Sequence, residues 1–134
     1  QDPAFAFGEG LSYTTFAYGE IVIDGADTPF TTDGTVHASV TLTNTGDRPG
    51  VEVVQAYVGD LVTSYSWTDR ELKAFRRVEL QPGESATVTF DIPVADCTIV
   101  DPDARRIVEP GEFELLIGHS SRRGDLKRAT FTVA

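Results

Sequence analysis

Acidic side chains are the most abundant groups in this chain that could do chemistry. Of its 134 residues, 21 are Asp or Glu. Hydrolysis by a pair of carboxylates needs the two groups about 5 to 10 Å apart across a cleft, one of them with a raised pKa. Most acidic residues here fall instead at turn sequences or on outward-facing positions of strands, as Asp91 and Glu114 do, where we expect water to solvate them. The pattern therefore predicts surface charge rather than a catalytic pair.

The chain has two histidines, His37 and His119, either of which could serve as a general base. His37 occupies a solvent-facing position of its predicted strand, and His119 ends another predicted strand. Neither lies near a nucleophile motif such as Gly-x-Ser-x-Gly. We therefore expect no Ser-His or Cys-His site, and no catalytic residue in this chain.

Metal and cofactor sites have equally weak support. Asp24, Asp27 and Asp33 share one loop whose oxygens could hold calcium, but their spacing does not match an EF-hand, and turn capping explains them. Cys97 is the only cysteine, which excludes an intramolecular disulfide and a cysteine-rich zinc site. We expect no cofactor and no metal.

Aromatic residues are the stronger candidates for contact with a ligand or a partner. Phe5, Phe7 and Tyr13 crowd an N-terminal segment that has neither strand nor helix periodicity. Tyr65 and Trp67 lie in the longest polar connection of the chain. Exposed aromatic rings anchor protein interfaces or stack on sugars. The alternative, that these rings fold back over the protein's own core, stays open.

Strict alternation of apolar and polar residues predicts several half-buried strands. It runs through residues 36–43 and 85–92, and through 113–117 and 129–133, which we interpret as a hairpin. Residues 51–58 carry apolar side chains on both parities. That pattern predicts a central strand covered on both sides.

Two further segments are less regular. Residues 14–23 look extended but change phase around Gly19, which predicts a bulge there. In residues 71–80 apolar side chains recur every three residues as on a short helix, yet the end of the segment fits a strand, and we interpret it as a strand. Turn sequences at 44–50 and 81–83 separate the strands, so the chain reads as a β-sandwich.

Composition favours one domain with its own hydrophobic core. The chain is 40% hydrophobic and 24% charged, which is ordinary for a globular protein. Its 11 Lys and Arg against 21 Asp and Glu give a net charge of −10, which would repel a phosphate backbone, so nucleic acid is not an expected partner.

No apolar run approaches the roughly 18 residues that cross a bilayer, and no leader is visible. We expect a soluble protein that contacts no membrane, and its compartment stays open.

Six segments carry motifs that belong together: residues 7–16 (FGEGLSYTTF), 44–47 (NTGD), 50–58 (GVEVVQAYV), 71–75 (ELKAF), 80–84 (LQPGE) and 108–113 (VEPGEF). Jointly they resemble the fibronectin type III-like domain of glycoside hydrolase family 3 enzymes, mostly β-glucosidases and β-xylosidases. The resemblance covers nearly the whole chain from Phe5 onward. Ala6, Glu9, Ala74 and the Trp67-Thr68 pair depart from the residues usual in that family.

The resemblance implies an all-β, immunoglobulin/fibronectin type III-like β-sandwich of about seven strands. Residues 1–13 would be an N-terminal strap or interdomain linker, and residues 14–134 the domain itself. In that family the catalytic residues lie on a (β/α)8 barrel and an α/β sandwich domain, neither of which is present here. The chain would then be a non-catalytic accessory domain, whose partners are the catalytic domains that it packs on and stabilises.

Two other functions stay open. A carbohydrate- or lignin-binding module would use Tyr65, Trp67 or a strand face to hold an enzyme on its polysaccharide. An adhesive fibronectin-like module unrelated to hydrolases would be complete in itself, and the aromatic N-terminal segment argues against it. On the first and favoured reading, the aromatic residues 5, 7, 13, 65 and 67 are candidate interface contacts.

Overall fold

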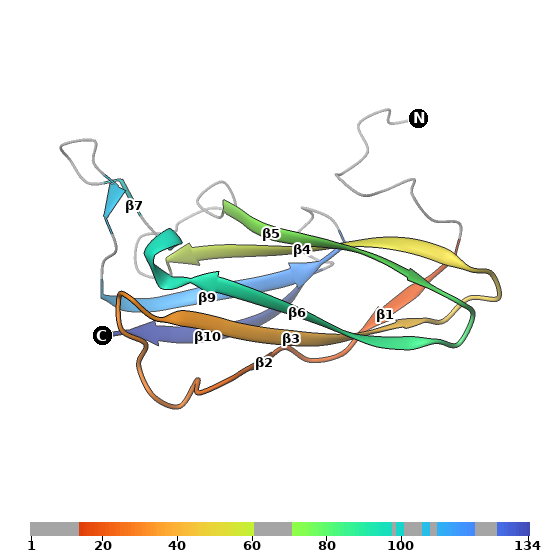
Figure 1. The fold of residues 1–134 in the computed structure, drawn as a ribbon, viewed down its shortest axis with the longest axis horizontal. Coiled ribbons are helices and arrows are strands. Elements are labelled where there is room, and N and C mark those ends of the chain that lie inside the picture. Colours follow the sequence, from red (N-terminus) through yellow and green to blue (C-terminus); the bar gives the residue numbers. More distant parts are fainter. Residues whose placement is uncertain (1–13, 61–70, 98, 101–105, 108–109, 120–125) are drawn as a thin grey trace.

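A computed structural model describes residues 14–60, 71–97, 99–100, 106–107, 110–119 and 126–134, and shows two antiparallel sheets packed face to face (Figure 1). The first, called the β3 sheet, contains β1 (Phe16–Tyr18), β2 (Val22–Ile23), β3 (Thr35–Asn44) and β6 (Ser85–Pro93). Both β1 and β2 pair with one side of β3, and β6 pairs with the other.

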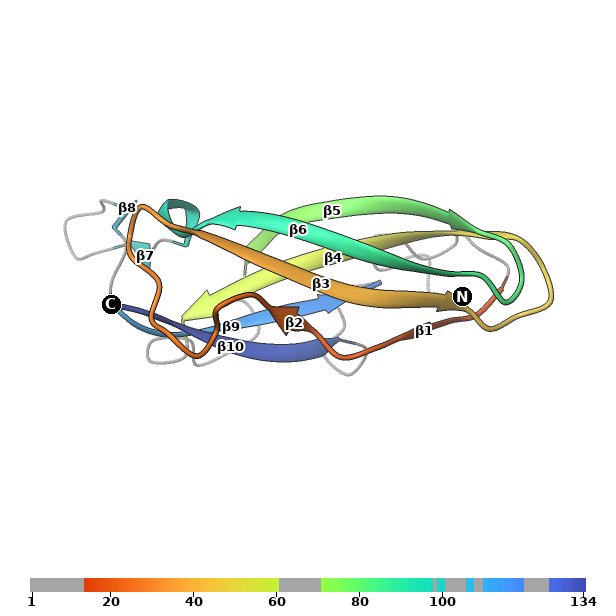
Figure 2. The same ribbon diagram turned by 60° about the horizontal axis from the view of Figure 1, so that its bottom comes forward.

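The second sheet, called the β4 sheet, has the strand order β10-β9-β4-β5 (Figure 2). Its strands are β4 (Gly50–Asp60), β5 (Glu71–Leu80), β9 (Gly111–Gly118) and β10 (Lys127–Val133). A short 3-10 turn, Val94–Asp96, and a small hairpin of β7 (Ile99–Val100) and β8 (Arg106–Ile107) follow β6. If β1 and β2 are taken as one interrupted strand, the described sandwich has seven main strands, as predicted.

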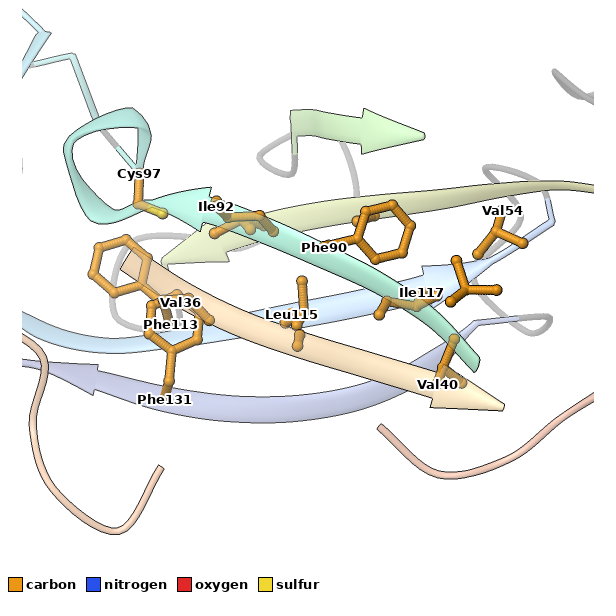
Figure 3. Close-up of a cluster of buried hydrophobic side chains, with 14 of the residues drawn as sticks. Val36, Val40, Val54, Phe90, Ile92, Cys97, Phe113, Leu115, Ile117 and Phe131 are labelled. Atoms are coloured by element: carbon orange, nitrogen blue, oxygen red, sulfur yellow. The ribbon is translucent and has the colours of Figure 1, made fainter. Parts of the chain in front are cut away.

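The core lies between the two sheets and is built by the predicted alternation. Every second residue of β3 from Val36 to Asn44 is buried, and so are Val88, Phe90 and Ile92 of β6. Figure 3 shows Val36 and Val40 of β3 and Phe90 and Ile92 of β6 facing Leu115 and Ile117 of β9 across the sandwich. The hairpin of β9 and β10 is also confirmed, with Phe113 opposite Phe131.

The predicted bulge at Gly19 explains the change of phase in the first strand. Tyr18 pairs with Leu42, whereas Val22 pairs with Ser39, so this strand has one more residue than β3 over the same interval. The Gly19 nitrogen still donates to the Thr41 carbonyl at 2.8 Å. The bulge turns the side chains on both sides of it toward the core, which Phe16, Tyr18, Ile21 and Ile23 all contact.

A second bulge explains why residues 71–80 looked helical. β5 pairs with β4 so that Ala74 lies opposite Ala56 and Leu72 opposite Tyr57, which makes Lys73 the extra residue. Beyond the bulge the parity reverses, so Leu72 and Phe75 share a face although they are three residues apart. The strand interpretation is therefore correct, and the bulge accounts for the spacing of three between Leu72 and Phe75.

The corner where β1, the β3–β4 turn and the β5–β6 turn meet is held by Asn44, which is fully buried. Its side-chain oxygen accepts hydrogen bonds from the Thr14 hydroxyl and the Gly46 nitrogen, both at 3.0 Å. Its amide nitrogen donates to the carbonyls of Arg48 at 2.8 Å and Leu80 at 3.1 Å. Both polar atoms of the side chain are thus satisfied without water, so a buried Asn is tolerated here.

The glycines of the same turn allow the first strand to pack closely on it. A Cβ on Gly46 would overlap the Thr14 hydroxyl and lie 3.2 Å from the Thr15 nitrogen. A Cβ on Gly50 would overlap the Thr14 methyl and lie 3.1 Å from the Phe16 ring. Close contact between the turn and residues 14–16 therefore explains why the motifs at 44–47 and 50–58 have glycine at positions 46 and 50.

The parity assignment predicts different effects of alanine at adjacent positions of β6. Phe90 is 1% exposed, so Phe90→Ala should lower the free energy of unfolding by about 3 to 5 kcal/mol. Thr89 points to solvent, and Thr89→Ala should change it by less than about 1 kcal/mol. Denaturant unfolding of both variants measures the difference, and equal effects would show that the two faces are wrongly assigned.

Replacement of Asn44 should destabilise the fold strongly, because this one side chain makes four hydrogen bonds. Asn44→Ala leaves the buried carbonyl of Leu80 without this donor, and we expect a loss of about 3 to 5 kcal/mol. Asn44→Asp should be worse at neutral pH, because a carboxylate would face two carbonyl oxygens. The adjacent Thr43→Ala, which removes only a hydroxyl contact with Ser85, is the control and should lose less than about 1 kcal/mol. Similar losses of unfolding free energy for Asn44→Ala and Thr43→Ala would refute the role given to Asn44.

Candidate functional site

The five aromatic residues predicted as contacts, Phe5, Phe7, Tyr13, Tyr65 and Trp67, lie outside the described residues. Their roles as interface or ligand contacts therefore remain predictions. The other candidate groups and the strands that form the two outer faces of the sandwich lie within the described residues.

His37 does have an acidic partner, Asp91, across the β3–β6 pair. The His37 Nδ1 and the Asp91 Oδ1 are 2.6 Å apart, and their side chains are 57% and 70% exposed. A catalytic histidine of this kind would also contact a nucleophile, and no hydroxyl is bonded to this ring within the part of the chain that the structure describes. The pair is a solvated cross-strand contact, as expected for the wet face of the strand.

The described residues hold no group of three or more His, Cys, Asp or Glu side chains that could bind a metal ion. In the loop considered for calcium, Asp33 accepts a hydrogen bond from the Thr31 hydroxyl at 2.6 Å, which holds the pKa of its carboxyl below the ordinary value. This local contact fits the turn-capping interpretation. Cys97 is free and buried, and burial raises the pKa of its thiol to about 11.

A polar pair that the sequence analysis missed, formed by a buried carboxylate and a partly buried tyrosine, joins the two sheets. Tyr18 of β1 donates its hydroxyl to the Glu52 carboxylate of β4 at 2.9 Å, and Glu52 is 4% exposed. Burial raises the pKa of Glu52 above its ordinary value, while the Tyr18 hydrogen bond and the charge of His119 act in the opposite direction. Burial also raises the pKa of Tyr18. The signal was available, because Glu52 shares the inward parity of Val54.

Glu52 should make the stability of the domain depend on pH. A carboxyl whose pKa is raised on folding binds its proton more tightly in the folded state, so its contribution is greatest below about pH 4.5 and is lost as the pH rises through the raised pKa. Glu52→Gln keeps an oxygen for Tyr18 but never ionises. Relative to the wild type, the variant should therefore become more stable as the pH rises from 4 to 7. Urea unfolding at the two pH values tests this, and a pH-independent difference would contradict it.

The outer face of the β3 sheet is polar. Facing pairs along β3 and β6 are His37 with Asp91, Ser39 with Thr89, Thr41 with Thr87, and Thr43 with Ser85. The last two hydroxyls are 2.7 Å apart. Val22, which is 58% exposed, is the large apolar side chain at the margin of this face. Such a surface is well solvated by water and has little to gain from being covered.

The outer face of the β4 sheet is different, because its central residues are buried. Gln55 and Leu116 are fully buried, and Val53, Tyr57 and Leu126 are each less than a tenth exposed. Tyr57 donates its hydroxyl to the Gln55 side chain at 3.0 Å, and Tyr57, Leu116 and Leu126 form a small apolar cluster of their own. This confirms the prediction that residues 51–58 are covered on both sides.

Glu114 corrects one expectation. It does lie on the outward parity of β9, but it is only 6% exposed rather than solvated. The reason is its position on the covered face of the β4 sheet. There Arg128 of β10 contacts its carboxylate at 3.4 Å, which supplies an opposite charge to a group removed from water.

At the edge of the same face, β5 carries two exposed apolar side chains. Leu72 is 43% exposed and Phe75 is 54% exposed, and both lie on the outer side of the sheet opposite Tyr57 and Gln55. We call Leu72 and Phe75 the β5 patch. It extends the buried apolar surface of Tyr57 outward to the solvent, on the last strand in the described order of this sheet.

No helix in the described part of the chain has the length or the apolar character needed to cross a lipid bilayer.

Comparisons with known proteins agree with the fold. The family model of the fibronectin type III-like domain matches residues 52–121. A β-xylosidase from Formosa agariphila is 44% identical over 131 residues, which are 98% of this chain and 18% of the relative. A periplasmic β-glucosidase from Salmonella typhimurium is 38% identical over 96% of this chain and 16% of its own length.

Solved structures give the same result. The structure of a β-glucosidase involved in saponin metabolism from intestinal bacteria matches all of this chain and 18% of its own, with 77% identity and a TM-score of 0.88. A Listeria innocua β-glucosidase in complex with glucose matches 91% of this chain and 16% of its own, with 31% identity and a TM-score of 0.74. The chain thus spans less than a fifth of the relatives that it matches. It belongs to the fibronectin type III-like domain family, in the form that occurs within the longer chains of β-glucosidases and β-xylosidases.

Proposed function

We propose that this chain is a non-catalytic accessory domain of a family 3 glycoside hydrolase, which packs on the catalytic domains of its parent and stabilises them. The observation that carries the proposal is the match of nearly the whole chain to 16–18% of β-glucosidases and β-xylosidases. A segment that occupies so small a share leaves ample length for catalytic domains elsewhere in the same polypeptide. The parent is a β-glucosidase on the strength of the 77% identity to one.

The chemistry of the described residues supports a structural role. The exposed His37–Asp91 pair is open to water on the outer face of the β3 sheet, and Glu52 accepts a hydrogen bond from Tyr18 between the two sheets. Acid–base catalysis needs such groups to converge on a substrate in a cleft. Residues 1–13, as a strap or linker, and the loop that carries Tyr65 and Trp67 complete the proposed contacts with the catalytic domains.

Removal of the domain from its parent tests this function. The parent that lacks residues 14–134 should melt at a lower temperature and lose activity on an aryl β-glucoside or a saponin, while the separate domain should show no hydrolysis. Turnover by the purified domain that disappeared on one carboxylate substitution within it would contradict the proposal. So would a truncated parent as stable and active as the whole enzyme.

Trp67→Ala separates docking from carbohydrate binding. For a docking residue we expect a lower melting temperature of the parent and unchanged adsorption to cellulose or xylan, because a desolvated aromatic anchor is worth about 2 kcal/mol or more. Loss of adsorption with the stability of the parent intact would instead favour the alternative function, a carbohydrate- or lignin-binding module. A melting temperature that falls as much in the separate domain would place Trp67 in the domain's own core.

A further inference from the structure

The two outer faces of the sandwich differ in a way that the proposed function does not specify. The β3 sheet presents rows of hydroxyl side chains, whereas the β4 sheet presents a surface whose centre is buried and whose margin is the β5 patch. Two large apolar side chains on one edge strand are unfavourably hydrated, and on protein surfaces such patches are often contact sites. We propose that the β5 patch, Leu72 and Phe75, is the surface through which this domain docks on the catalytic part of its parent glycosidase.

The bulge at Lys73 is what creates the patch. In a regular strand, residues 72 and 75 would point to opposite faces, and Leu72 would lie on the side that faces the sandwich core. The extra residue in β5 turns Leu72 outward, so that it lies opposite Tyr57 and on the same face as Phe75. Bulges re-aim side chains at functional edges of sheets, and this one places a second apolar group beside the first.

The surroundings of the patch resemble the layout of a protein interface. On the inner side it continues into Tyr57, which is 8% exposed, and along β5 the same face continues into Arg77 and Glu79, which are exposed. An apolar anchor with a polar rim is the usual arrangement of a protein contact. The hydroxyl rows of the β3 sheet have no comparable centre.

The size of the patch argues for a tethered partner. Two protruding side chains supply much less than the roughly 800 Å² per partner that a stable independent complex buries. The relatives are more than five times as long as the segment that matches this chain, so the rest of such an enzyme is joined covalently to the domain. Covalent linkage raises the effective concentration of the partner, and a small contact then suffices. The inference rests on the proposed function, because it takes the catalytic part of the parent as the partner.

Cysteine labelling in the full-length parent tests the inference with a matched control. Phe75 on the β4 sheet and Val22 on the β3 sheet are 54% and 58% exposed in the domain, so Phe75→Cys and Val22→Cys present thiols of similar accessibility. The native Cys97 is buried with a raised thiol pKa and should react slowly. With mass spectrometry to locate the label, we expect the thiol at position 22 to react at least about tenfold faster than the thiol at position 75.

Leu72→Cys is the second probe and should be protected like the thiol at position 75, provided that each variant retains wild-type activity. Equal rates at positions 22 and 75, or faster labelling at 75, would overturn the inference. Protection at 75 that is lost on dilution would assign the patch to a second copy of the protein, and protection that requires added polysaccharide would assign it to substrate. Both results would also overturn it.

The outcome is distinguishable from a failure of the proposed function. If removal of residues 14–134 destabilises the parent but position 75 labels as fast as position 22, the accessory role stands and the docking face is wrong. If removal leaves the parent unchanged, the accessory role fails whatever the labelling shows. Leu72→Thr with Phe75→Thr, compared with Val22→Thr, gives a third measure, since only the double variant should lower the melting temperature of the parent.

Discussion

Burial of both faces of β4 is the constraint on which the rest of the molecule depends. Val54 on the inner side and Gln55 on the outer side are both inaccessible to water, although an ordinary sandwich strand has one wet face. The inner side closes the core against the β3 sheet. The outer side makes the β4 sheet a partly dry surface, which is why Glu114 needs Arg128 and why Tyr57 bonds to Gln55. A sheet of this kind excludes water from the centre of its outer face, while its margin carries the exposed β5 patch.

The alignment of the two sheets is fixed by polar groups at one corner rather than by the apolar core alone. Apolar side chains can shift past one another at a small cost in free energy. The Asn44 side chain, in contrast, makes all its hydrogen bonds only when the Thr14 hydroxyl and the carbonyls of Arg48 and Leu80 are in one arrangement. Tyr18 and Glu52 add a second link between the sheets, in which the hydrogen bond favours the ionised carboxylate while burial opposes its ionisation. Both links involve residues 14–18. The first strand is thus bound to the sandwich at the point where any segment before it must enter.

The sequence allowed the strands and their inner faces to be predicted, because parity reports directly which side chains share a face. Val36 to Leu42 and Val88 to Ile92 were recognised in this way, and the phase change at Gly19 located a bulge. Parity does not report what covers a face, so the solvation expected for Glu114 was wrong and Glu52 was missed. The bulge in β5 was hidden for a related reason. Its extra residue, Lys73, gave Leu72 and Phe75 a spacing of three, which is also the spacing of a helix, and only the pairing with β4 separates the two. The aromatic contacts predicted at positions 5, 7, 13, 65 and 67 fall outside the described residues.

The residues that hold the domain together and those proposed to connect it to its parent are separate sets. Phe90, Asn44 and Glu52 act inside the sandwich, while Leu72 and Phe75 are about half exposed and contribute less to the folding of the domain itself. Hydration of the exposed part of the β5 patch is unfavourable in the separate domain, and in the proposed docking the free energy of its burial belongs to the assembled enzyme. In the proposed accessory role, the domain folds on its own core and gains further stability when it is docked. The same arrangement would let it stabilise the catalytic domains, as proposed, without contributing a catalytic group.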